Sequence, residues 1–218
     1  KYKSLLAVDN TFASPVIQQP AKLGADIVAY STTKYINGHS DVIGGALTTS
    51  NVELYTKLKF LQNAIGAILS PFDSWLTLRG LRTLELRMKR HVDNAEKIAT
   101  FLNKHKKIKK VCYPGLFAGE QKKIVKKQMK RPGGMLSIEI KEKYNVKKFL
   151  ASLKYFPLAE SLGGVESLID HPTSMTHASI PKKEREKIGL SDGLLRISVG
   201  IENIEDLIDD LKQALDKI

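Results

Sequence analysis

The stretch that decides the fold is ADIVAYSTTKYINGHSDVIGG, residues 25–45. Its apolar opening (25–31) predicts a buried strand, and the apolar run SLLAVDN (4–10) predicts another. The segment between them contains prolines and a short helical pattern that ends at Gly24, which indicates a crossover. Residues 4–31 therefore predict a βαβ-like unit of an open α/β sheet.

Polar and reactive side chains follow both of these predicted strands. In open α/β sheets ligands bind at the carboxyl ends of strands, where Asp9 and the segment Ser31–Lys34 are expected. The hydroxyls of Ser31 and Thr33 suit a phosphate group, and a lysine beside a phosphate and an aldehyde suits Schiff-base chemistry. Pyridoxal 5'-phosphate (PLP) carries both groups and needs an acid against its ring nitrogen, a role that suits Asp9. On this pattern alone, an N-cap serine and a surface Lys34 are the simpler interpretation.

The rest of the chain predicts a third strand, a helical region and a mixed second half. The third strand is expected at 44–50, and residues 52–105 are helical in pattern. Ser70-Pro71 marks a helix start, followed by one very long helix or two in succession. Further strands are expected at 108–116 (with a turn), 133–141, 158–169 (broken at Gly163-Gly164) and 193–200, and further helices at 122–131, 145–156 and 203–218. This second half predicts an α+β arrangement, with the long helix as the domain boundary.

The composition suits a globular protein of one large or two small domains, with 218 residues of which 42% are hydrophobic. No apolar run approaches the roughly 18–20 residues of a membrane-spanning helix, so no membrane partner is expected. Cys112 is the only cysteine, which excludes an internal disulfide and makes a cytoplasmic setting the expectation. Only nearby lysines would activate Cys112 as a nucleophile, so that interpretation is the weaker one. The chain starts without Met and almost directly in a strand, which suggests a truncated or processed protein.

The net charge of +12 raises the alternative of nucleic-acid binding. The lysines concentrate at 104–110 and 122–131, the latter resembling a helix with one buried edge. No aromatic residues interleave with them, although readers of RNA and single strands usually require aromatic platforms. A solvated helix face is therefore favoured and no nucleic-acid partner is expected. A basic nucleic-acid-binding fragment without cofactor remains the hypothesis from a different class.

Three ordered motifs carry a resemblance that covers essentially the whole chain. The first is AVDNTFASPVIQQPAKLGADIVAYSTTKYINGHSDVIGGAL (7–47), the second AESLGGVESLIDHPTSMTHASIP (159–181), and the third GLSDGLLRISVGIENIEDLIDDL (189–211). Together they closely resemble the Cys/Met-metabolism PLP enzymes, the group of cystathionine γ-synthase, γ-lyase and β-lyase. The resemblance implies the aspartate aminotransferase-like fold (fold type I), an α/β architecture with a mostly parallel sheet in the large domain and an α+β small domain. Residues 1–80 would be the later part of the PLP-binding domain, and 81–218 the linking helix and small domain.

The resemblance also implies a cofactor site. Lys34 matches the lysine that forms the Schiff base with PLP and shuttles protons on the substrate. Asp9 matches the partner of the pyridine nitrogen, and Ser31 and Thr33 match phosphate ligands. His39 and Asp41 are too few for a metal site and match a structural turn, so no metal is expected.

The substrate site implied by the resemblance comes from the second and third motifs. Arg196 matches the arginine that binds the substrate α-carboxylate, which suits its planar two-donor fork. Ser161 matches a serine beside Lys34 and that carboxylate. Glu160 matches a position facing the distal end of the substrate, and glutamate there points toward γ-chemistry. His177 matches a position near the site and is interpreted as structural.

The implied function is a PLP-dependent γ-replacement that forms cystathionine from an O-acylhomoserine and cysteine, as in cystathionine γ-synthase. Cystathionine γ-lyase, cystathionine β-lyase and O-acetylhomoserine sulfhydrylase share the motifs and are the alternatives. The family assembles as homotetramers, dimers of dimers with shared active sites. Its front half supplies a ring-stacking tyrosine, further phosphate ligands and an arm into a neighbouring site, none of which is expected in these residues. The 218-residue chain alone is therefore not expected to catalyse.

Overall fold

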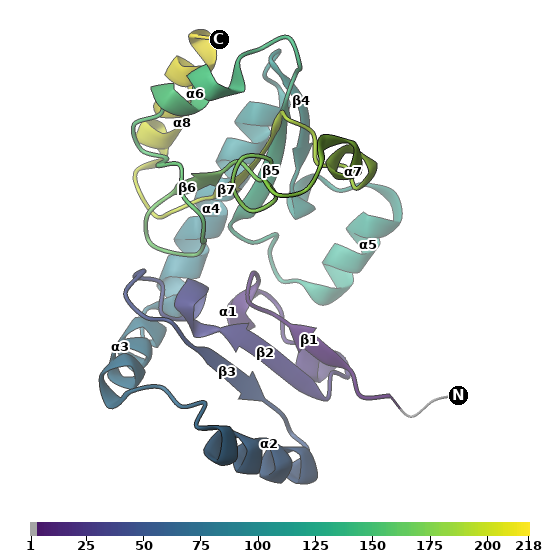
Figure 1. Ribbon diagram of the computed structural model, residues 1–218, viewed down its shortest axis with the longest axis vertical. Helices are drawn as coiled ribbons and strands as arrows, with labels where there is room; N and C mark the ends of the chain where they lie inside the picture. Colours follow the sequence, from purple (N-terminus) through teal and green to yellow (C-terminus); the bar gives the residue numbers. More distant parts are fainter. Residues whose placement is uncertain (1–3) are drawn as a thin grey trace.

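The computed structural model describes residues 4–218, which form two lobes joined by one long helix (Figure 1). The lower lobe in that view holds strands β1 (Ala7–Asp9), β2 (Ile27–Ser31) and β3 (Gly45–Thr48). β1 and β2 are parallel, with Asp9 opposite Ala29, and α1 (Ser14–Ile17) and a 3₁₀ turn (Pro20–Leu23) form the crossover between them. The turn ends at Gly24, which adopts φ +100°, a left-handed conformation that glycine tolerates. The predicted βαβ-like unit is confirmed.

The expectation of a mostly parallel sheet needs a correction. β3 is antiparallel to β2, with Ser31 opposite Gly45, so only one of the two strand pairs in this sheet is parallel. The physical reason is that no crossover helix carries the chain from Ser31 back to the other end of the sheet. Residues 32–44 instead form a local turn, and a short connection returns the chain antiparallel.

Three helices follow the lower sheet, as the helical pattern predicts. α2 (Val52–Ile65) begins where the Asn51 side chain accepts a hydrogen bond from the Leu54 N–H, and it ends at Gly66. α3 (Pro71–Leu81) begins at Ser70, whose hydroxyl accepts from the Asp73 N–H. α4 (Leu84–Asn103) is separate from α3, so the alternative of two helices in succession holds.

The upper lobe is an antiparallel sheet with the strand order β4-β5-β7-β6. Its strands are β4 (Ile108–Cys112), β5 (Met135–Ile140), β6 (Leu168–Asp170) and β7 (Leu194–Ser198), and its helices are α5 (Gly119–Gln128), α6 (Val146–Ser152), α7 (Lys182–Lys187) and α8 (Ile204–Asp216). Burial alternates along β5, where Leu136, Ile138 and Ile140 point into the core. This core is shared by the sheet with α4, α6 and α8. The α+β prediction for the second half is confirmed.

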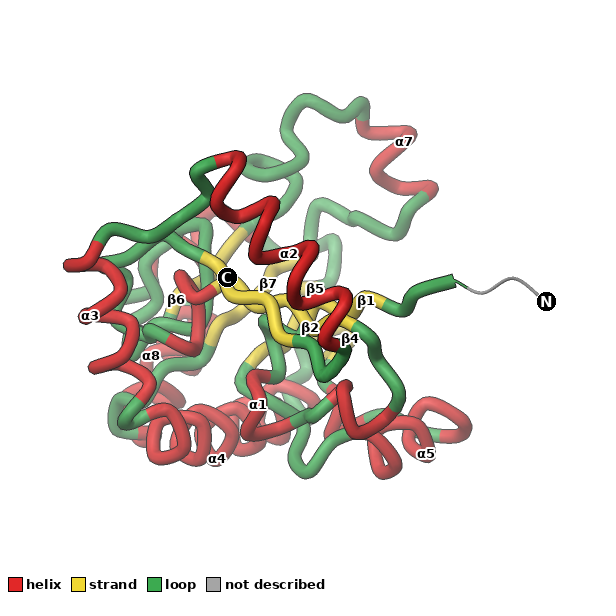
Figure 2. Tube along the Cα trace, turned by 90° about the horizontal axis from the view of Figure 1, so that it is seen from below, coloured by secondary structure: helices red, strands yellow, loops and turns green. Residues whose placement is uncertain are grey.

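Two local expectations for this lobe are wrong. The strand expected at 158–169 is reduced to β6 and one bridge between Leu158 and Ile169, because Ser161 and Gly163 adopt positive φ and interrupt it. The lysine-rich helix, α5, buries none of its residues rather than one edge. Figure 2 shows that α7 extends from the side of the molecule opposite to α4.

A smaller core cluster lies where the lobes meet. Met88 and Val92 of α4 pack there with Ala13, Tyr35 and Leu162, which come from segments far apart in sequence. Because α4 contributes to both clusters, it connects the turn after β2 to the upper sheet. The domain division at residues 80 and 81 stays a prediction. Within residues 4–218, no helix combines the length and apolar character needed to cross a bilayer.

Candidate active site

Lys34 lies in the turn that directly follows β2. The turn, Thr32–Ile36, is an irregular helical segment in which Lys34 itself leaves the helical conformation, at φ −92° and ψ −134°. Its Nζ donates a hydrogen bond of 2.7 Å to Ser161 Oγ, 127 residues later in the chain. Burial, and then the positive charge of Arg196, lowers the pKa of the Lys34 amine. The structure therefore places the predicted lysine against a residue of the second motif, in surroundings that shift its ionisation toward the neutral amine.

Asp9 ends β1 on the neighbouring strand, at the same edge of the sheet. The Thr11 N–H donates to Asp9 Oδ1 at 2.9 Å, and hydrogen bonds from the hydroxyl and backbone of Thr11 lower the pKa of Asp9. Thr11 Oγ1 also accepts a hydrogen bond of 2.8 Å from the Ser31 N–H. Thr11, which the sequence reasoning did not single out, thus ties the end of β1 to the end of β2 and keeps Asp9 ionised.

The two predicted phosphate ligands lie in the segment that leads into Lys34: Ser31 ends β2, and Thr33 is engaged in the turn. Thr33 Oγ1 accepts from the Gly44 N–H at 3.0 Å and donates to the Gly44 carbonyl at 3.3 Å. The neighbouring Thr32 Oγ1 is buried and has no hydrogen-bond partner among the described residues. A Cβ at Gly44 would lie 2.7 Å from this oxygen, so glycine is required for the close approach. The hydroxyls and the amine of this turn, with the Asp9 carboxylate at the same edge of the sheet, are groups whose chemistry fits a phosphate-bearing aldehyde with a basic ring.

Ser161 brings Lys34 and Arg196 together. Its hydroxyl accepts from Lys34, and its carbonyl accepts a 3.2 Å hydrogen bond from Arg196 Nη2. Ser161 adopts φ +91°, a conformation that costs free energy in a non-glycine residue and is found mainly where the surrounding structure imposes it. Three predicted site residues from the three motifs thus form one contiguous group.

Arg196 lies in the middle of β7, opposite Ser137 of β5 on one side and Asp170 of β6 on the other. Its neighbours Leu195 and Ile197 are fully buried in the core, so Arg196 lies on the opposite face of the sheet. Arg196 Nη2 is 3.5 Å from Asp170 Oδ2. Asp170 is a member of the site that the sequence reasoning missed, because only the register of β6 against β7 brings it to Arg196.

The other predicted residues have looser connections to this group. Glu160 is exposed and makes no hydrogen bond or ion pair among residues 4–218, although its charge helps to raise the pKa of Asp170. His39 Nδ1 bonds to the Asn37 carbonyl, and Asn37 Nδ2 donates to Asp41 Oδ1, so both belong to the turn's own hydrogen bonds. His177 lies in the loop after β6 and bonds to Thr176. In the described part of the chain, no cluster of three or more His, Cys, Asp or Glu side chains is placed to hold a metal ion.

Arg87 of α4 holds the turn that carries Lys34. It is 4% exposed, and its guanidinium donates to the carbonyls of Tyr35 (2.7 Å), Ile36 (3.1 Å) and Gly80 (2.8 Å). A Cβ on Gly38 would lie 2.1 Å from Arg87 Nη1, which explains a glycine there. The sequence gives no signal for this role, because an arginine in an amphipathic helix is ordinarily exposed.

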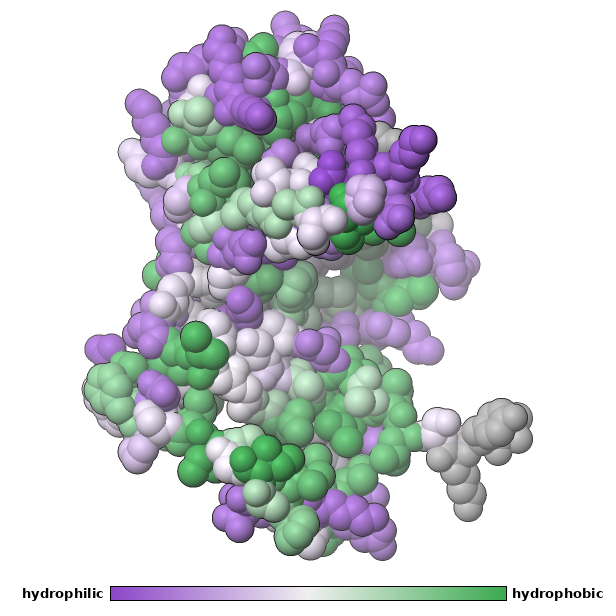
Figure 3. Space-filling model, in the orientation of Figure 1, coloured by the Kyte–Doolittle hydropathy of each residue, from purple (hydrophilic) through white to green (hydrophobic). Residues whose placement is uncertain are grey.

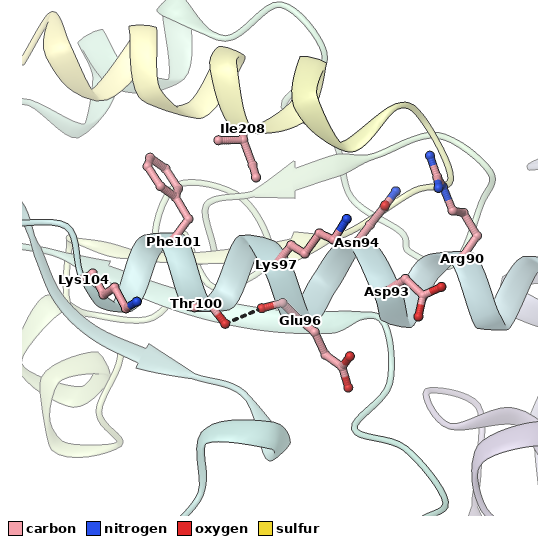
Figure 4. A pocket seen from close by; sticks show the side chains of 9 residues that line it. All are labelled: Arg90, Asp93, Asn94, Glu96, Lys97, Thr100, Phe101, Lys104 and Ile208. Atoms are coloured by element: carbon pink, nitrogen blue, oxygen red, sulfur yellow. Dashed lines mark hydrogen bonds between the residues drawn. The ribbon is translucent and has the colours of Figure 1, made fainter.

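Two cavities differ in their relation to this group. A pocket of about 250 Å³ is lined by Arg196 together with Phe12, Met135 and Cys112, between the segment after β1 and the upper sheet. A groove of about 640 Å³ runs along α4, and Figure 4 shows its side chains, with Ile208 contributed by α8. The acidic residues of that groove, Asp93 and Glu96, pair with Arg131. None of the predicted site residues lines it.

Comparison with known proteins decides the family. The model of the Cys/Met metabolism PLP-dependent enzymes matches residues 1–216. The chain belongs to this family. The resemblance inferred from the three motifs is confirmed, and the family is PLP-dependent.

Relatives within the family carry out different reactions. The chain is 57% identical over 216 residues to a cystathionine β-lyase of Lactococcus lactis subsp. cremoris (strain MG1363), covering 99% of this chain and 57% of that protein. It is 59% identical over 213 residues to a cystathionine γ-lyase of Dictyostelium discoideum, covering 97% and 55%. The chain therefore spans little more than half the length of the curated relatives it matches.

Solved structures agree on the fold. A cystathionine γ-lyase from Lactobacillus plantarum complexed with L-serine superposes with a TM-score of 0.94 at 47% identity, over 98% of this chain and 56% of that one. A cystathionine γ-synthase from Xanthomonas oryzae pv. oryzae, in complex with aminoacrylate and cysteine, gives 0.93 at 50% identity, over 99% and 56%. The fold is thus the α/β fold of this family, while β-lyase, γ-lyase and γ-synthase names all occur among its relatives.

Proposed function

We propose that the chain is the later part of a PLP-dependent transsulfuration enzyme that makes or cleaves cystathionine. The observation that supports this best is the hydrogen bond from Lys34 Nζ to Ser161 Oγ, because Ser161 also holds Arg196. A base and a carboxylate-binding arginine on one serine match the needs of α-amino-acid chemistry. The family match supplies the cofactor class.

Three residues of this chain take the chemical roles in that proposal. PLP, when bound, supplies an electrophilic aldehyde and a ring that stores negative charge. Lys34 removes and returns the α-proton, since only a neutral amine acts as a base and burial lowers its pKa. Asp9 would hold the ring nitrogen as a carboxylate, and Arg196 would bind the substrate carboxylate through its planar fork.

Ser31 and Thr33 are assigned to the phosphate of the cofactor. Both lie in the segment that leads into Lys34, where neutral hydroxyls and backbone N–H groups are available. The Thr33 hydroxyl donates to the Gly44 carbonyl in this structure. To donate to a phosphate instead, the hydroxyl must rotate its proton away from that carbonyl. The site would thus bind the cofactor with a rotation of one hydroxyl.

Within the group we assign γ-replacement, the formation of cystathionine from an O-acylhomoserine and cysteine. Glu160 supports chemistry at the γ-carbon, because it directly precedes Ser161 and its exposed carboxylate is free of partners in residues 4–218. The second candidate is cystathionine cleavage. The identities of 57% and 59% to a β-lyase and a γ-lyase favour it over the 50% to the γ-synthase structure.

Assembly into a homotetramer with shared sites is part of the proposal, as is a cytoplasmic location. Exposed apolar side chains gather on the lower lobe, where Figure 3 shows extended hydrophobic areas. We call this region the apolar face; it comprises Leu47 of β3, Val52, Tyr55, Phe60 and Ile65 of α2, and Phe72, Trp75 and Leu78 of α3. None of the residues of α2 is fully buried, and its apolar residues other than the partly buried Leu54 and Leu58 are exposed. Exposed apolar areas of this kind mark contact surfaces.

The deciding experiment assays the full-length enzyme with O-succinylhomoserine plus cysteine, and separately with cystathionine alone. Cystathionine as product identifies the synthase, whereas release of cysteine or homocysteine from cystathionine identifies a γ- or β-lyase. Lys34→Ala is expected to abolish turnover and to remove the absorbance of lysine-bound cofactor. A colourless full-length protein that binds DNA or RNA in a salt-sensitive manner would instead support the nucleic-acid hypothesis.

A further inference from the structure

Asp170 is a buried carboxylate whose surroundings call for an explanation. It is 2% exposed at the end of β6, and neither of its oxygens accepts a hydrogen bond among the described residues. A buried carboxylate without hydrogen bonds is costly unless a positive charge lies near it. The Arg196 guanidinium, 3.5 Å from Oδ2, is the ion-pair partner that the structure gives it.

The strand register fixes this pair. Asp170 and Arg196 are directly opposite each other in the antiparallel β6–β7 ladder, so their side chains leave the same face of the sheet as neighbours. Because both positions belong to regular strands, the relation between the two groups does not depend on a flexible loop.

The contacts of Arg196 are concentrated at one end of its fork. Nη2 donates to the Ser161 carbonyl at 3.2 Å and faces Asp170 Oδ2 at 3.5 Å, whereas Nε and Nη1 make no hydrogen bond to residues 4–218. A guanidinium is planar and rigid, so holding Nη2 from two directions also sets the direction of the remaining N–H donors.

We propose that Asp170 is a positioning residue, which orients the Arg196 guanidinium so that its remaining donors meet the α-carboxylate of an amino-acid substrate. This inference rests on the proposed function of Arg196 and adds a residue to it. The chain of contacts then runs from Asp170 through Arg196 and Ser161 to Lys34. Asp170 itself need not touch the substrate.

The test measures ligand affinity in the full-length holoenzyme through the change in cofactor absorbance on titration. L-alanine, which has a carboxylate but no leaving group, is compared with L-alaninamide, which lacks the carboxylate. Asp170→Asn is expected to raise the dissociation constant of L-alanine about tenfold, as for one misaligned charge-assisted contact, and to leave that of L-alaninamide within about twofold. Asp170→Ser repeats the charge removal with a smaller side chain, should the asparagine variant fold poorly.

The matched control is Asp93→Asn, which removes a carboxylate paired with Arg131 at 2.8 Å in the same lobe and is expected to change neither constant. Unchanged or tighter L-alanine binding in Asp170→Asn would overturn the proposal, because tighter binding means that Asp170 competes with the substrate. An equal loss of affinity for L-alanine and L-alaninamide would overturn it too, because a general structural effect weakens the binding of both ligands alike.

A double-mutant cycle separates this inference from the function on which it rests. Arg196→Gln is expected to weaken the binding of L-alanine strongly. Adding Asp170→Asn to that variant is expected to leave the dissociation constant of L-alanine unchanged. If Arg196→Gln leaves L-alanine binding unchanged, the assignment of Arg196 fails. If it weakens binding while Asp170→Asn does not, only the role of Asp170 fails.

Discussion

At the scale of single residues, Ser161 contacts two predicted site residues, Lys34 and Arg196, from a strained backbone conformation. It accepts from Lys34 and from Arg196, while its φ of +91° lies in the left-handed region. A strained residue with two such contacts is typical of sites where geometry is held for chemistry.

Removal of the Ser161 hydroxyl has a predictable result. In Ser161→Ala the Lys34 amine loses its acceptor, so kcat should fall about 2- to 10-fold, the range for a hydrogen bond between neutral groups, with a smaller change in KM. Ser161→Gly should show the same decrease in kcat. Its free energy of unfolding should be about 1 kcal/mol higher than that of Ser161→Ala, because glycine relieves the backbone strain. Steady-state kinetics and denaturant unfolding measure both; wild-type kcat in either variant would contradict the role of the hydroxyl.

At the scale of elements, α4 carries buried polar groups between the lobes. His91 is fully buried, its Nδ1–H donates to the Val199 carbonyl at 2.7 Å, and its ring meets Tyr35 edge-on at 5.1 Å. Burial lowers the pKa of His91 to about 4. The helix thus connects the residue after Lys34 with the end of β7 through a histidine that is neutral in the folded state.

This histidine predicts acid sensitivity. Its folded pKa lies below the unfolded value of 6.5, so the unfolded state binds its proton first and stability is lost as the pH falls below 6.5. Relative to His91→Gln, the wild-type free energy of unfolding should decrease by about 3 kcal/mol between pH 6.5 and pH 4. Urea unfolding across that range measures it, with His39→Asn, at an exposed histidine, as the control. Parallel pH profiles for wild type and His91→Gln would refute it.

The sequence predicts some of these features and not others, for a physical reason. The placement of Lys34 and Asp9 at one edge of the sheet follows from strand patterns, because the ends of parallel strands meet there, whereas their cofactor roles come only from the family motifs. Arg196 and Ser161 are recognised only through the family motifs, since nothing local marks a strand arginine as a ligand. Thr11, Arg87 and Asp170 were missed because their roles come from register and long-range contacts. The antiparallel β3 was missed because the glycine-rich return after the Lys34 turn was interpreted only as a strand start.

At the scale of the whole molecule, the apolar face leaves the lower lobe with exposed apolar side chains on α2, α3 and β3. A groove of about 720 Å³ lies between α2 and the sheet, lined by Leu47, Tyr55 and Leu61. In contrast, the upper lobe has one continuous core of its own. The upper lobe therefore buries its apolar side chains in its own core, whereas the lower lobe leaves many of its apolar side chains exposed.

The purified 218-residue chain is expected to self-associate at micromolar concentrations, because exposed apolar surface drives association. It is also expected to lack turnover, because the front half of the family's active site is not among these residues. Replacing Phe60, Ile65 and Trp75 by lysine should shift the chain toward the monomer in light-scattering chromatography. The same changes should weaken the proposed tetramer of the full-length protein. Lysine in place of Gln62, Asn63 and Ser74, polar positions near the same residues, is the control. A monomeric, catalytically active isolated chain would contradict both expectations.

The shared contact at Ser161 has a stereochemical consequence. Lys34 and Arg196 both hydrogen-bond to Ser161, so the proposed base and the proposed carboxylate-binding group are held close to each other. If Arg196 binds the carboxylate and the cofactor holds the amino group, as proposed, a substrate would present its α-hydrogen toward Lys34 in only one of its two mirror-image forms. Chiral discrimination between L- and D-amino acids would thus be set by a single strained serine.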